Sequence, residues 1–99
     1  MKVAAVQTDI RIGQVDQNVA RLSECLRETA RNGASLTIFP ECALTGYCFP
    51  NLEEALRYGQ QVPGPATQEL ARVCAELNVF TVFGTVEADG NRVFNTAVL

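Results

Sequence analysis

The most informative segment of this chain of 99 residues reads Phe39-Pro40-Glu41-Cys42-Ala43-Leu44-Thr45-Gly46-Tyr47. A short apolar run, residues 36–39, leads into it and predicts a strand that Pro40 ends. Glu41 is therefore expected at the carboxyl end of a sheet strand, where open α/β sheets place their ligand sites. Its sequence neighbours are largely apolar, and partial desolvation of a carboxylate favours work as a general base.

Two roles stay open for Glu41 on these residues alone. One is a general base at a ligand site, and the other is a purely structural acid that caps a loop or pairs with an arginine. Gly46 allows a turn in the following loop, and this turn would fold Tyr47 back toward the same place.

The apolar periodicity of the rest of the chain predicts alternating strands and helices. The strands at residues 3–8 and 79–86 are apolar on both faces and are therefore expected to be buried on both. The predicted strands cover residues 3–8, 36–39, 79–86 and 92–99, and the predicted helices cover residues 17–32, 52–58 and 65–77.

Single residues predict where several of these elements begin and end. Asp16 is expected to cap the first helix, and Gly33 is expected to end it in a left-handed conformation. Pro65 suits the first turn of the third helix, because its missing N–H would be unpaired there anyway. Asn78 can end that helix, and Asp89-Gly90 predicts a two-residue hairpin turn.

This order of elements predicts an α/β protein in which helices pack on a sheet. The length suits one small domain. The sequence stops at Thr96-Ala97-Val98-Leu99, inside the last predicted strand. We therefore expect residues 1–99 to be the N-terminal portion of one longer domain.

The overall composition narrows the classes of function. The net charge is -3 and the eight lysine and arginine residues are scattered, so no basic stripe indicates nucleic acid as a partner. The longest apolar runs have the length of strands, which indicates no membrane span. The first residues reach the polar Gln7 too soon for a secretory segment, and a cytoplasmic location is the default expectation.

The set of reactive side chains is narrow. The chain has no histidine, which removes Ser-His, Cys-His and His-metal mechanisms. Its four cysteines, Cys25, Cys42, Cys48 and Cys74, form no C-x-x-C pair, so neither a disulfide nor a metal site is expected. Cys25 and Cys74 fall near the apolar faces of helices, whereas Cys42 and Cys48 are expected to pack in or near the loop. A redox role for the last two is a minor alternative, because C-x5-C spacing carries no recognised mechanism.

Three segments along the chain form a recognisable series. They are Val3-Ala4-Ala5-Val6-Gln7-Thr8, then Phe39-Pro40-Glu41 with Leu44-Thr45-Gly46-Tyr47, and then Phe83-Gly84-Thr85-Val86-Glu87 followed by Val93-Phe94-Asn95-Thr96-Ala97. In turn they resemble the first strand, the catalytic-glutamate motif and the next paired strands of the nitrilase superfamily of carbon–nitrogen hydrolases. The middle motif is the most specific, and together the three span the chain.

The resemblance implies an α/β fold of the αββα sandwich type, of which this chain covers the first part. It also implies a hydrolase of small amides, carbamoyl amides or nitriles, with a Glu-Lys-Cys catalytic set and no metal or organic cofactor. In that set the glutamate takes the proton of the cysteine thiol, the thiolate attacks the substrate carbon, and the lysine stabilises the developing negative charge. Homo-oligomers are common in the family, and a homo-oligomer is expected here.

Carried over residue by residue, the resemblance assigns one catalytic position, Glu41 as the general base. Lys2 is the only lysine and does not match the family's lysine, and the family's lysine and cysteine would lie further along than the last residue. Cys42 is not the nucleophile, because adjacent side chains diverge on an extended backbone. Tyr47 is a candidate substrate-binding residue, with anchoring of the loop as the alternative. Asn95 is expected to secure backbone near the site.

Two functions stay open. The version of the motif in residues 44–47 resembles the amidase and N-carbamoyl amide hydrolase branches more than the true nitrilases, which favours an amidase-type enzyme. The alternative is that the chain is a non-catalytic binding or assembly module, because half of a sandwich exposes an apolar sheet face that drives association. The isolated chain is accordingly expected to be inactive and to associate.

Overall fold

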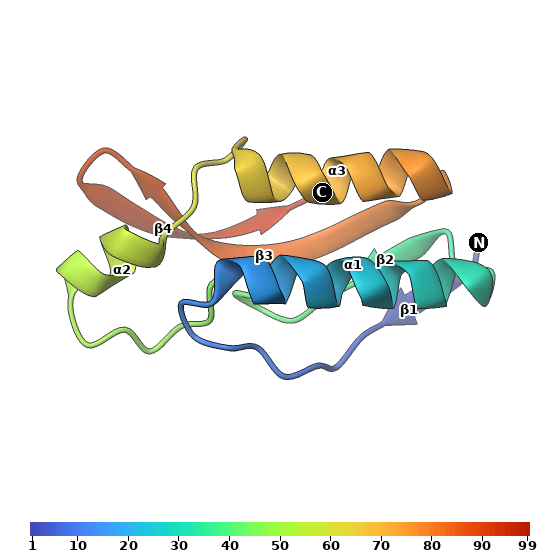
Figure 1. Cartoon of the computed structure of the whole chain (residues 1–99), viewed down its shortest axis with the longest axis horizontal. Coiled ribbons are helices and arrows are strands. Elements are labelled where there is room, and N and C mark those ends of the chain that lie inside the picture. Colours follow the sequence, from blue (N-terminus) through green and yellow to red (C-terminus); the bar gives the residue numbers. More distant parts are fainter.

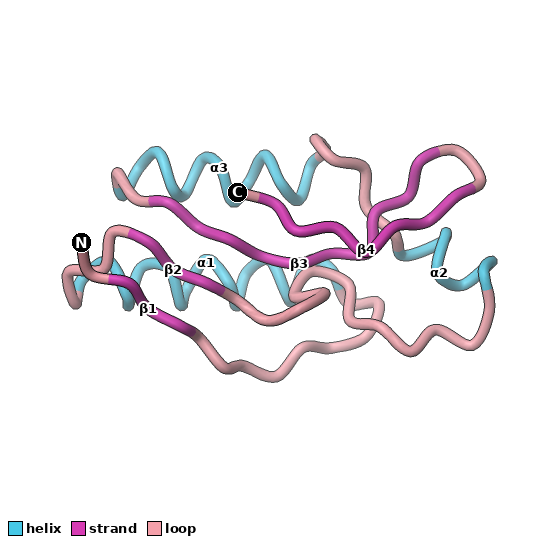
Figure 2. The backbone as a smooth tube through the Cα atoms, turned by 180° about the vertical axis from the view of Figure 1, so that it is seen from behind, coloured by secondary structure: helices cyan, strands magenta, loops and turns pink.

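A computed structural model describes all 99 residues and shows one four-stranded sheet with two long helices on one of its faces (Figure 1). Seen from behind, the strands lie in front of these two helices, and no helix covers the near face of the sheet (Figure 2). The elements in chain order are β1 (Val3–Ala5), α1 (Val15–Arg31), β2 (Leu36–Ile38), α2 (Leu52–Tyr58), α3 (Pro65–Leu77), β3 (Phe80–Asp89) and β4 (Arg92–Val98).

The sheet has the strand order β1-β2-β3-β4. The first three strands are parallel, and β4 returns antiparallel to β3 through a hairpin. α1 connects β1 to β2, and α3 lies in the connection from β2 to β3. Both connections step in the same direction across the sheet, and parallel connections are right-handed, so α1 and α3 lie on the same face.

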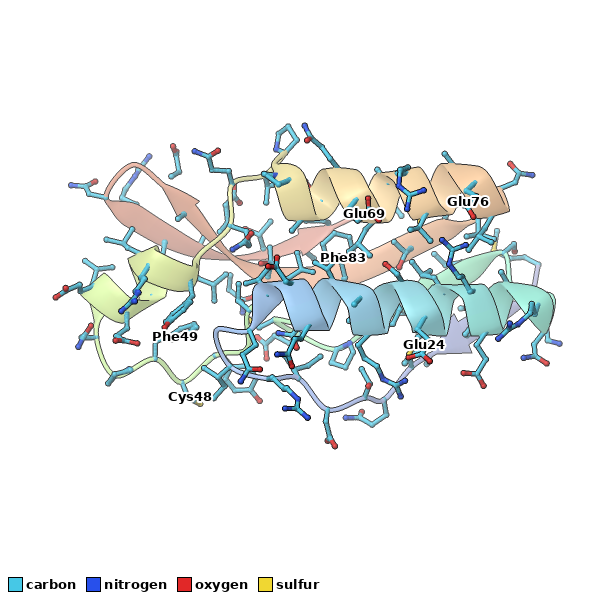
Figure 3. All side chains as sticks on the ribbon, in the orientation of Figure 1. Glu24, Cys48, Phe49, Glu69, Glu76 and Phe83 are labelled. Atoms are coloured by element: carbon cyan, nitrogen blue, oxygen red, sulfur yellow. The ribbon has the colours of Figure 1, made fainter.

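The hydrophobic core fills the space between these helices and the sheet. Leu22 and Leu26 of α1 and Leu70 and Val73 of α3 are completely buried and belong to one cluster with Phe83 of β3. Phe83 lies between the two long helices in the view of Figure 3. Each of these helices has one apolar side, as the periodicity of the sequence predicts. The full cluster consists of Leu22, Cys25, Leu26, Phe39, Ala43, Leu44, Ala66, Leu70, Val73 and Phe83.

The opposite face of the sheet is open. Val3, Ile38 and Phe80 are 50%, 40% and 65% exposed, although each lies on one of the three parallel strands. Val3 and Phe80 both pair with Leu36, and Ile38 lies one pleat further along. The prediction that these strands are buried on both faces is therefore wrong for residues 1–99, because helices cover only one face. The apolar sequence pattern predicts that both faces are packed against other residues, and no part of residues 1–99 packs on this face.

Several predicted boundaries also differ from the structure, and β3 runs to Asp89 rather than to residue 86. α1 begins at Val15 after Gln14, so Asp16 does not cap it but lies in its first turn, where a negative charge still favours the helix dipole. β1 ends at Ala5 rather than at residue 8. The hairpin turn consists of residues 90–91, one residue later than predicted, because Asp89 still pairs with Arg92.

Other local signals are confirmed. α2 has the predicted bounds, and Pro65 is the first residue of α3. Gly33 and Asn78 follow the ends of their helices, as predicted, with φ angles of 87° and 55°. The left-handed conformation was predicted for Gly33, and Asn78 adopts it as well. None of the helices combines the length and the apolar character that a bilayer crossing requires.

Asn18 joins three parts of the fold through one buried side chain. It is 2% exposed and lies in the first turns of α1. Its Oδ1 accepts from the backbone N–H of Arg11 at 3.0 Å, and its Nδ2 donates to the carbonyl oxygens of Arg11 at 2.8 Å and Leu44 at 2.9 Å. The amide thus connects the helix, the loop after β1 and the loop that contains Glu41.

Replacing Asn18 by Ala is expected to destabilise the protein by about 2–3 kcal/mol, because buried backbone groups of both loops lose their partners. Urea denaturation measures this change. Gln17→Ala, at the exposed neighbouring position, is the matched control and should change stability by less than about 0.5 kcal/mol. Equal effects of the two substitutions would contradict the role of Asn18.

Candidate active site

Glu41 lies just past the carboxyl end of β2, as predicted, but it is exposed there, so the expected partial desolvation is wrong for residues 1–99. The chain leaves β2 through Phe39, whose N–H still donates to Val82 of β3 at 2.8 Å. It then turns tightly, because the N–H of Gly46 donates back to the carbonyl oxygen of Cys42 at 2.8 Å. Cys42 and Gly46 both have positive φ angles, 49° and 70°. We call residues 41–47 the glutamate loop.

The glutamate loop crosses directly over β3 at Gly84. A Cβ atom on Gly84 would lie 2.5 Å from the backbone nitrogen of Cys42 and 3.0 Å from the Cα atom of Glu41. No side chain fits there, so glycine is required by the close approach of two backbones. The N–H of Leu44 donates to the carbonyl oxygen of Gly84 at 3.3 Å across this crossing.

Thr45, which lies in the glutamate loop, stabilises the same crossing through hydrogen bonds. Its side chain is fully buried, and its Oγ1 accepts from the backbone N–H of Val86 at 3.0 Å and donates to the carbonyl oxygen of Gly46 at 2.9 Å. Thr45, Asn18 and Gly84 therefore fix the loop relative to α1 and β3. Sequence reasoning placed Thr45 and Gly84 in motifs but gave them no structural role, and it did not single out Asn18, because all three act through contacts between distant segments.

The carboxylate of Glu41 is held by a residue from β4. Nδ2 of Asn95 donates to Oε1 of Glu41 at 2.5 Å. Oδ1 of the same amide accepts a weak hydrogen bond from the thiol of Cys42 at 3.8 Å. The expectation that Asn95 secures backbone is therefore wrong, because its amide contacts two side chains of the glutamate loop. Oε2 of Glu41 has no hydrogen-bond partner within residues 1–99.

Glu41 borders two depressions. The first has a volume of about 370 Å³, lies between the glutamate loop and the loop after β1, and is also lined by Tyr47, Cys48 and Asp9. The second has a volume of about 380 Å³, lies toward the open face of the sheet, and includes Asn95 and Gly84. Tyr47 is 55% exposed and lies beside the same depression as Glu41, the position that the turn at Gly46 predicts.

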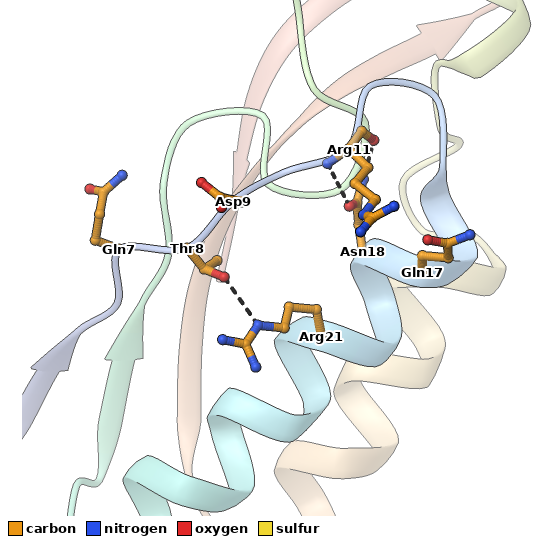
Figure 4. A pocket seen from close by; sticks show the side chains of 7 residues that line it. All are labelled: Gln7, Thr8, Asp9, Arg11, Gln17, Asn18 and Arg21. Atoms are coloured by element: carbon orange, nitrogen blue, oxygen red, sulfur yellow. Dashed lines mark hydrogen bonds between the residues drawn. The ribbon is translucent and has the colours of Figure 1, made fainter.

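A further depression of about 420 Å³ lies on the other side of the loop after β1 and has only polar lining residues (Figure 4). In it Arg21 Nε donates to Thr8 Oγ1 at 3.2 Å, and Asn18 is bonded to Arg11. Neither Glu41 nor a thiol lines this depression. We therefore assign the candidate active site to the depressions beside Glu41.

The cysteines of the loop differ from each other. Cys42 is 3% exposed, and burial, with a smaller contribution from the charge of Glu41, raises the pKa of its thiol. A thiol that resists ionisation is a poor nucleophile at neutral pH. The backbone at Cys42 is left-handed rather than extended, so the stated reason against a nucleophilic Cys42 is wrong, and burial provides a better one. Cys48 is exposed.

The one lysine of the chain lies away from Glu41. All four cysteines are free, and no three His, Cys, Asp or Glu side chains are grouped to hold a metal ion. The Nζ of Lys2 donates to the carbonyl oxygen of Asn32 at 2.6 Å, beyond the C-terminal end of α1. This is the end of the sheet where the parallel strands begin, and Glu41 lies at the other end.

The fold and the position of Glu41 define an α/β protein with an acidic side chain beside depressions at the carboxyl ends of its parallel strands. The carbon-nitrogen hydrolase family matches residues 2–99, and the chain belongs to this family. The nitrilase of Pyrococcus abyssi is 36% identical over 100 residues, which cover all of this chain and 38% of the relative. The omega-amidase of Homo sapiens is 30% identical over 99 residues, which cover 99% of this chain and 34% of the relative.

Solved structures support the same assignment. A crystal structure of N-terminal amidase with an Asn-Glu peptide matches with a TM-score of 0.81 at 29% identity, over 98% of this chain and 24% of that chain. The fold class predicted from the sequence, α/β of the nitrilase and amidase type, is thus confirmed. The chain spans between a third and two fifths of the length of these two curated relatives.

Replacing Gly84 by Ala is expected to push the glutamate loop off β3. The new Cβ would overlap the backbone of Cys42, and we expect a loss of about 1–3 kcal/mol of stability. Displacement also exposes the thiol of Cys42, so its alkylation by iodoacetamide should accelerate, as followed by peptide mass spectrometry. Cys48 is exposed and should label first in both proteins.

The matched control is Gly90→Ala in the hairpin turn. A Cβ at Gly90 meets nothing within 4 Å, and φ is +62° there, so only a left-handed strain of about 1 kcal/mol applies. The labelling rate of Cys42 should stay as in the native protein. If Gly84→Ala leaves both stability and Cys42 labelling unchanged, the close approach does not constrain the loop.

Proposed function

We propose that the protein of which residues 1–99 are part hydrolyses non-peptide carbon–nitrogen bonds in amides, carbamoyl amides or nitriles, with Glu41 as its general base. The observation that supports this most is the position of the Glu41 carboxylate. It borders an open depression at a strand end, and Asn95 holds one of its oxygens while the other has no partner in the chain. A general base needs a free, oriented acceptor within reach of its proton donor.

The mechanism follows from the resemblance and from membership of the family. Glu41 accepts the proton of a cysteine thiol, and the thiolate attacks the carbon of the amide or nitrile to form a thioester or thioimidate. A lysine stabilises the negative charge that develops on the substrate. From an amide, ammonia or an amine leaves with the proton that Glu41 returns; from a nitrile, a first water converts the thioimidate to a thioester and ammonia leaves. A water activated by Glu41 then hydrolyses the thioester to the acid and regenerates the thiol. We propose that the lysine and the cysteine come from outside residues 1–99, because no residue of this chain matches the family's lysine or cysteine position. In addition, Lys2 lies at the far end of the sheet and Cys42 is a buried, weakly acidic thiol.

Within this class we favour an amidase-type substrate. The loop sequence Leu44-Thr45-Gly46-Tyr47 supports this, and an omega-amidase and an N-terminal amidase are among the similar proteins. Tyr47 extends beside the depression next to Glu41, and we propose that its ring contacts the substrate. The nitrilase of Pyrococcus abyssi is also similar, so nitriles belong in the same assay.

Glu41→Gln in the full-length protein should lower turnover by at least about 100- to 10,000-fold, because the amide cannot accept the thiol proton. Ammonia release from linear amides, carbamoyl amines and nitriles measures the change. The control is Glu53→Gln, an exposed glutamate in the first turn of α2, which should keep native turnover. Near-native turnover of Glu41→Gln would show that Glu41 is misassigned, and activity on nitriles alone would reject the amidase preference.

The open sheet face bears on a second candidate function, that of a non-catalytic assembly module. We propose that a further segment of the same domain covers Val3, Ile38 and Phe80 in the full-length protein. Residues 1–99 are then the N-terminal portion of a single domain. The proposed homo-oligomer forms through other surfaces. The competing proposal is that residues 1–99 work alone as a non-catalytic assembly module. Both explain an exposed apolar patch of this kind.

The isolated chain of residues 1–99 should be inactive and should associate through this face. Sedimentation velocity is expected to show oligomers or aggregates, and Phe80→Ser should shift the distribution toward monomer, because it removes the most exposed ring of the patch. Phe94→Ser is the matched control, since Phe94 is 43% exposed but pairs with Glu87 on the other side of the pleat. A monomeric native chain that melts cooperatively would contradict the prediction.

A further inference from the structure

We propose that Asn95 is a positioning residue that orients the Glu41 carboxylate for proton transfer, and that the Cys42 thiol fixes the orientation of the Asn95 amide. This inference rests on the proposed role of Glu41 as general base. It assigns roles to two side chains for which the sequence indicated only backbone support and packing.

The register of the sheet brings Asn95 to Glu41. Asn95 pairs with Val86, and Ala97 pairs with Gly84, so Asn95 lies on the same side of the sheet as the place where the glutamate loop crosses. Since Gly84 has no side chain, the loop lies low enough for the amide to reach it. The resulting contact of 2.5 Å joins residues that are 54 positions apart, and a contact of this kind holds only if β4 and the loop keep their places.

The amide has a defined orientation. Its Nδ2 faces Glu41, and its Oδ1 faces the thiol of Cys42. A reversed amide would place Oδ1 against the carboxylate, where two acceptors would repel each other, and would place the N–H₂ group against the thiol. A neutral thiol is the donor that Oδ1 needs, and burial raises the pKa of Cys42 and so keeps it protonated. Cys42 thus has a use in the site without being a nucleophile.

A neutral amide such as that of Asn95 is a suitable partner for a general base. A carboxylate that pairs with arginine is held by a full positive charge, which strongly favours its ionised form and weakens it as a proton acceptor. None of the salt bridges within residues 1–99 involves Glu41. Asn95 holds Oε1 in place through one neutral N–H, and Oε2 keeps its lone pairs for the incoming proton.

The test uses Asn95→Ala and Asn95→Asp in the full-length protein. Asn95→Ala should lower kcat by about 100-fold with KM little changed, because the carboxylate loses its orientation but substrate binding does not use the amide. Asn95→Asp should lower kcat further and move the acid limb of the kcat/KM profile to higher pH, since a second carboxylate opposes loss of the proton from the first. Asn91→Asp in the exposed hairpin turn adds the same charge and should change neither quantity.

The double substitution Glu41→Gln with Asn95→Asp separates the contact from the catalysis. The amide and the carboxylate exchange places, so the hydrogen bond can re-form, and the melting temperature should recover relative to Asn95→Asp alone while activity stays absent. If the double variant melts no higher than expected from adding the melting-temperature losses of Glu41→Gln and Asn95→Asp, the contact is overturned. A native pH profile and kcat in both single Asn95 variants, with Glu41→Gln inactive, would overturn the positioning role. Full activity of Glu41→Gln would instead overturn the proposed function, and the melting temperatures would still decide whether Asn95 holds residue 41.

Discussion

The structure depends on the close passage of two backbones, the glutamate loop over β3 at Gly84. The distance leaves no room for a Cβ atom, and the loop is held down on both sides of the crossing. Thr45 bonds the N–H of Val86, and Asn18 bonds the carbonyl oxygen of Leu44 from α1. Hydrogen bonds to buried backbone are costly to remove, so the path of the loop is determined by the interior of the protein rather than by the loop's own turn preferences.

The position of Glu41 follows from this crossing and from the topology of the sheet. The parallel strands β1, β2 and β3 direct their carboxyl ends to one edge, where ligand sites form in such sheets, and the loop emerges there. The antiparallel β4 then passes beside β3 and brings Asn95 to the same place. In a fully parallel sheet another crossover connection would precede the fourth strand. Here a short hairpin connects β3 to β4 instead, and this places the amide of Asn95 next to the carboxylate of Glu41.

Local chemistry explains which parts of this arrangement could be predicted from the sequence. Pro65, Gly33 and Asn78 mark helix ends by their own backbone preferences, and the apolar run before Pro40 places Glu41 at a strand end. The residues that sequence reasoning missed act over long distances: Gly84 is required by a loop some forty residues earlier, and Asn95 contacts a side chain 54 positions away. The prediction that Asp16 caps the first helix is wrong because the helix starts at Val15, one residue before it. Capping preferences do not locate a helix start to within one or two residues. Apolar runs correctly indicate strands, but they do not reveal which face the same chain covers.

The open sheet face and the candidate active site meet at Glu41. One of its two depressions extends over Gly84 and Ala97 toward that face, whereas the helix side is filled by Leu22, Leu70 and Phe83. In the proposed enzyme the missing lysine and cysteine must therefore approach from the open side, because the core blocks the other. The segment that covers the exposed apolar residues would then also remove water from the Glu41–Asn95 pair, which strengthens the electrostatic interactions within the site. Completion of the hydrophobic core and completion of the catalytic set would be one structural event, and this explains why a chain can fold its glutamate loop so firmly and still lack a closed site.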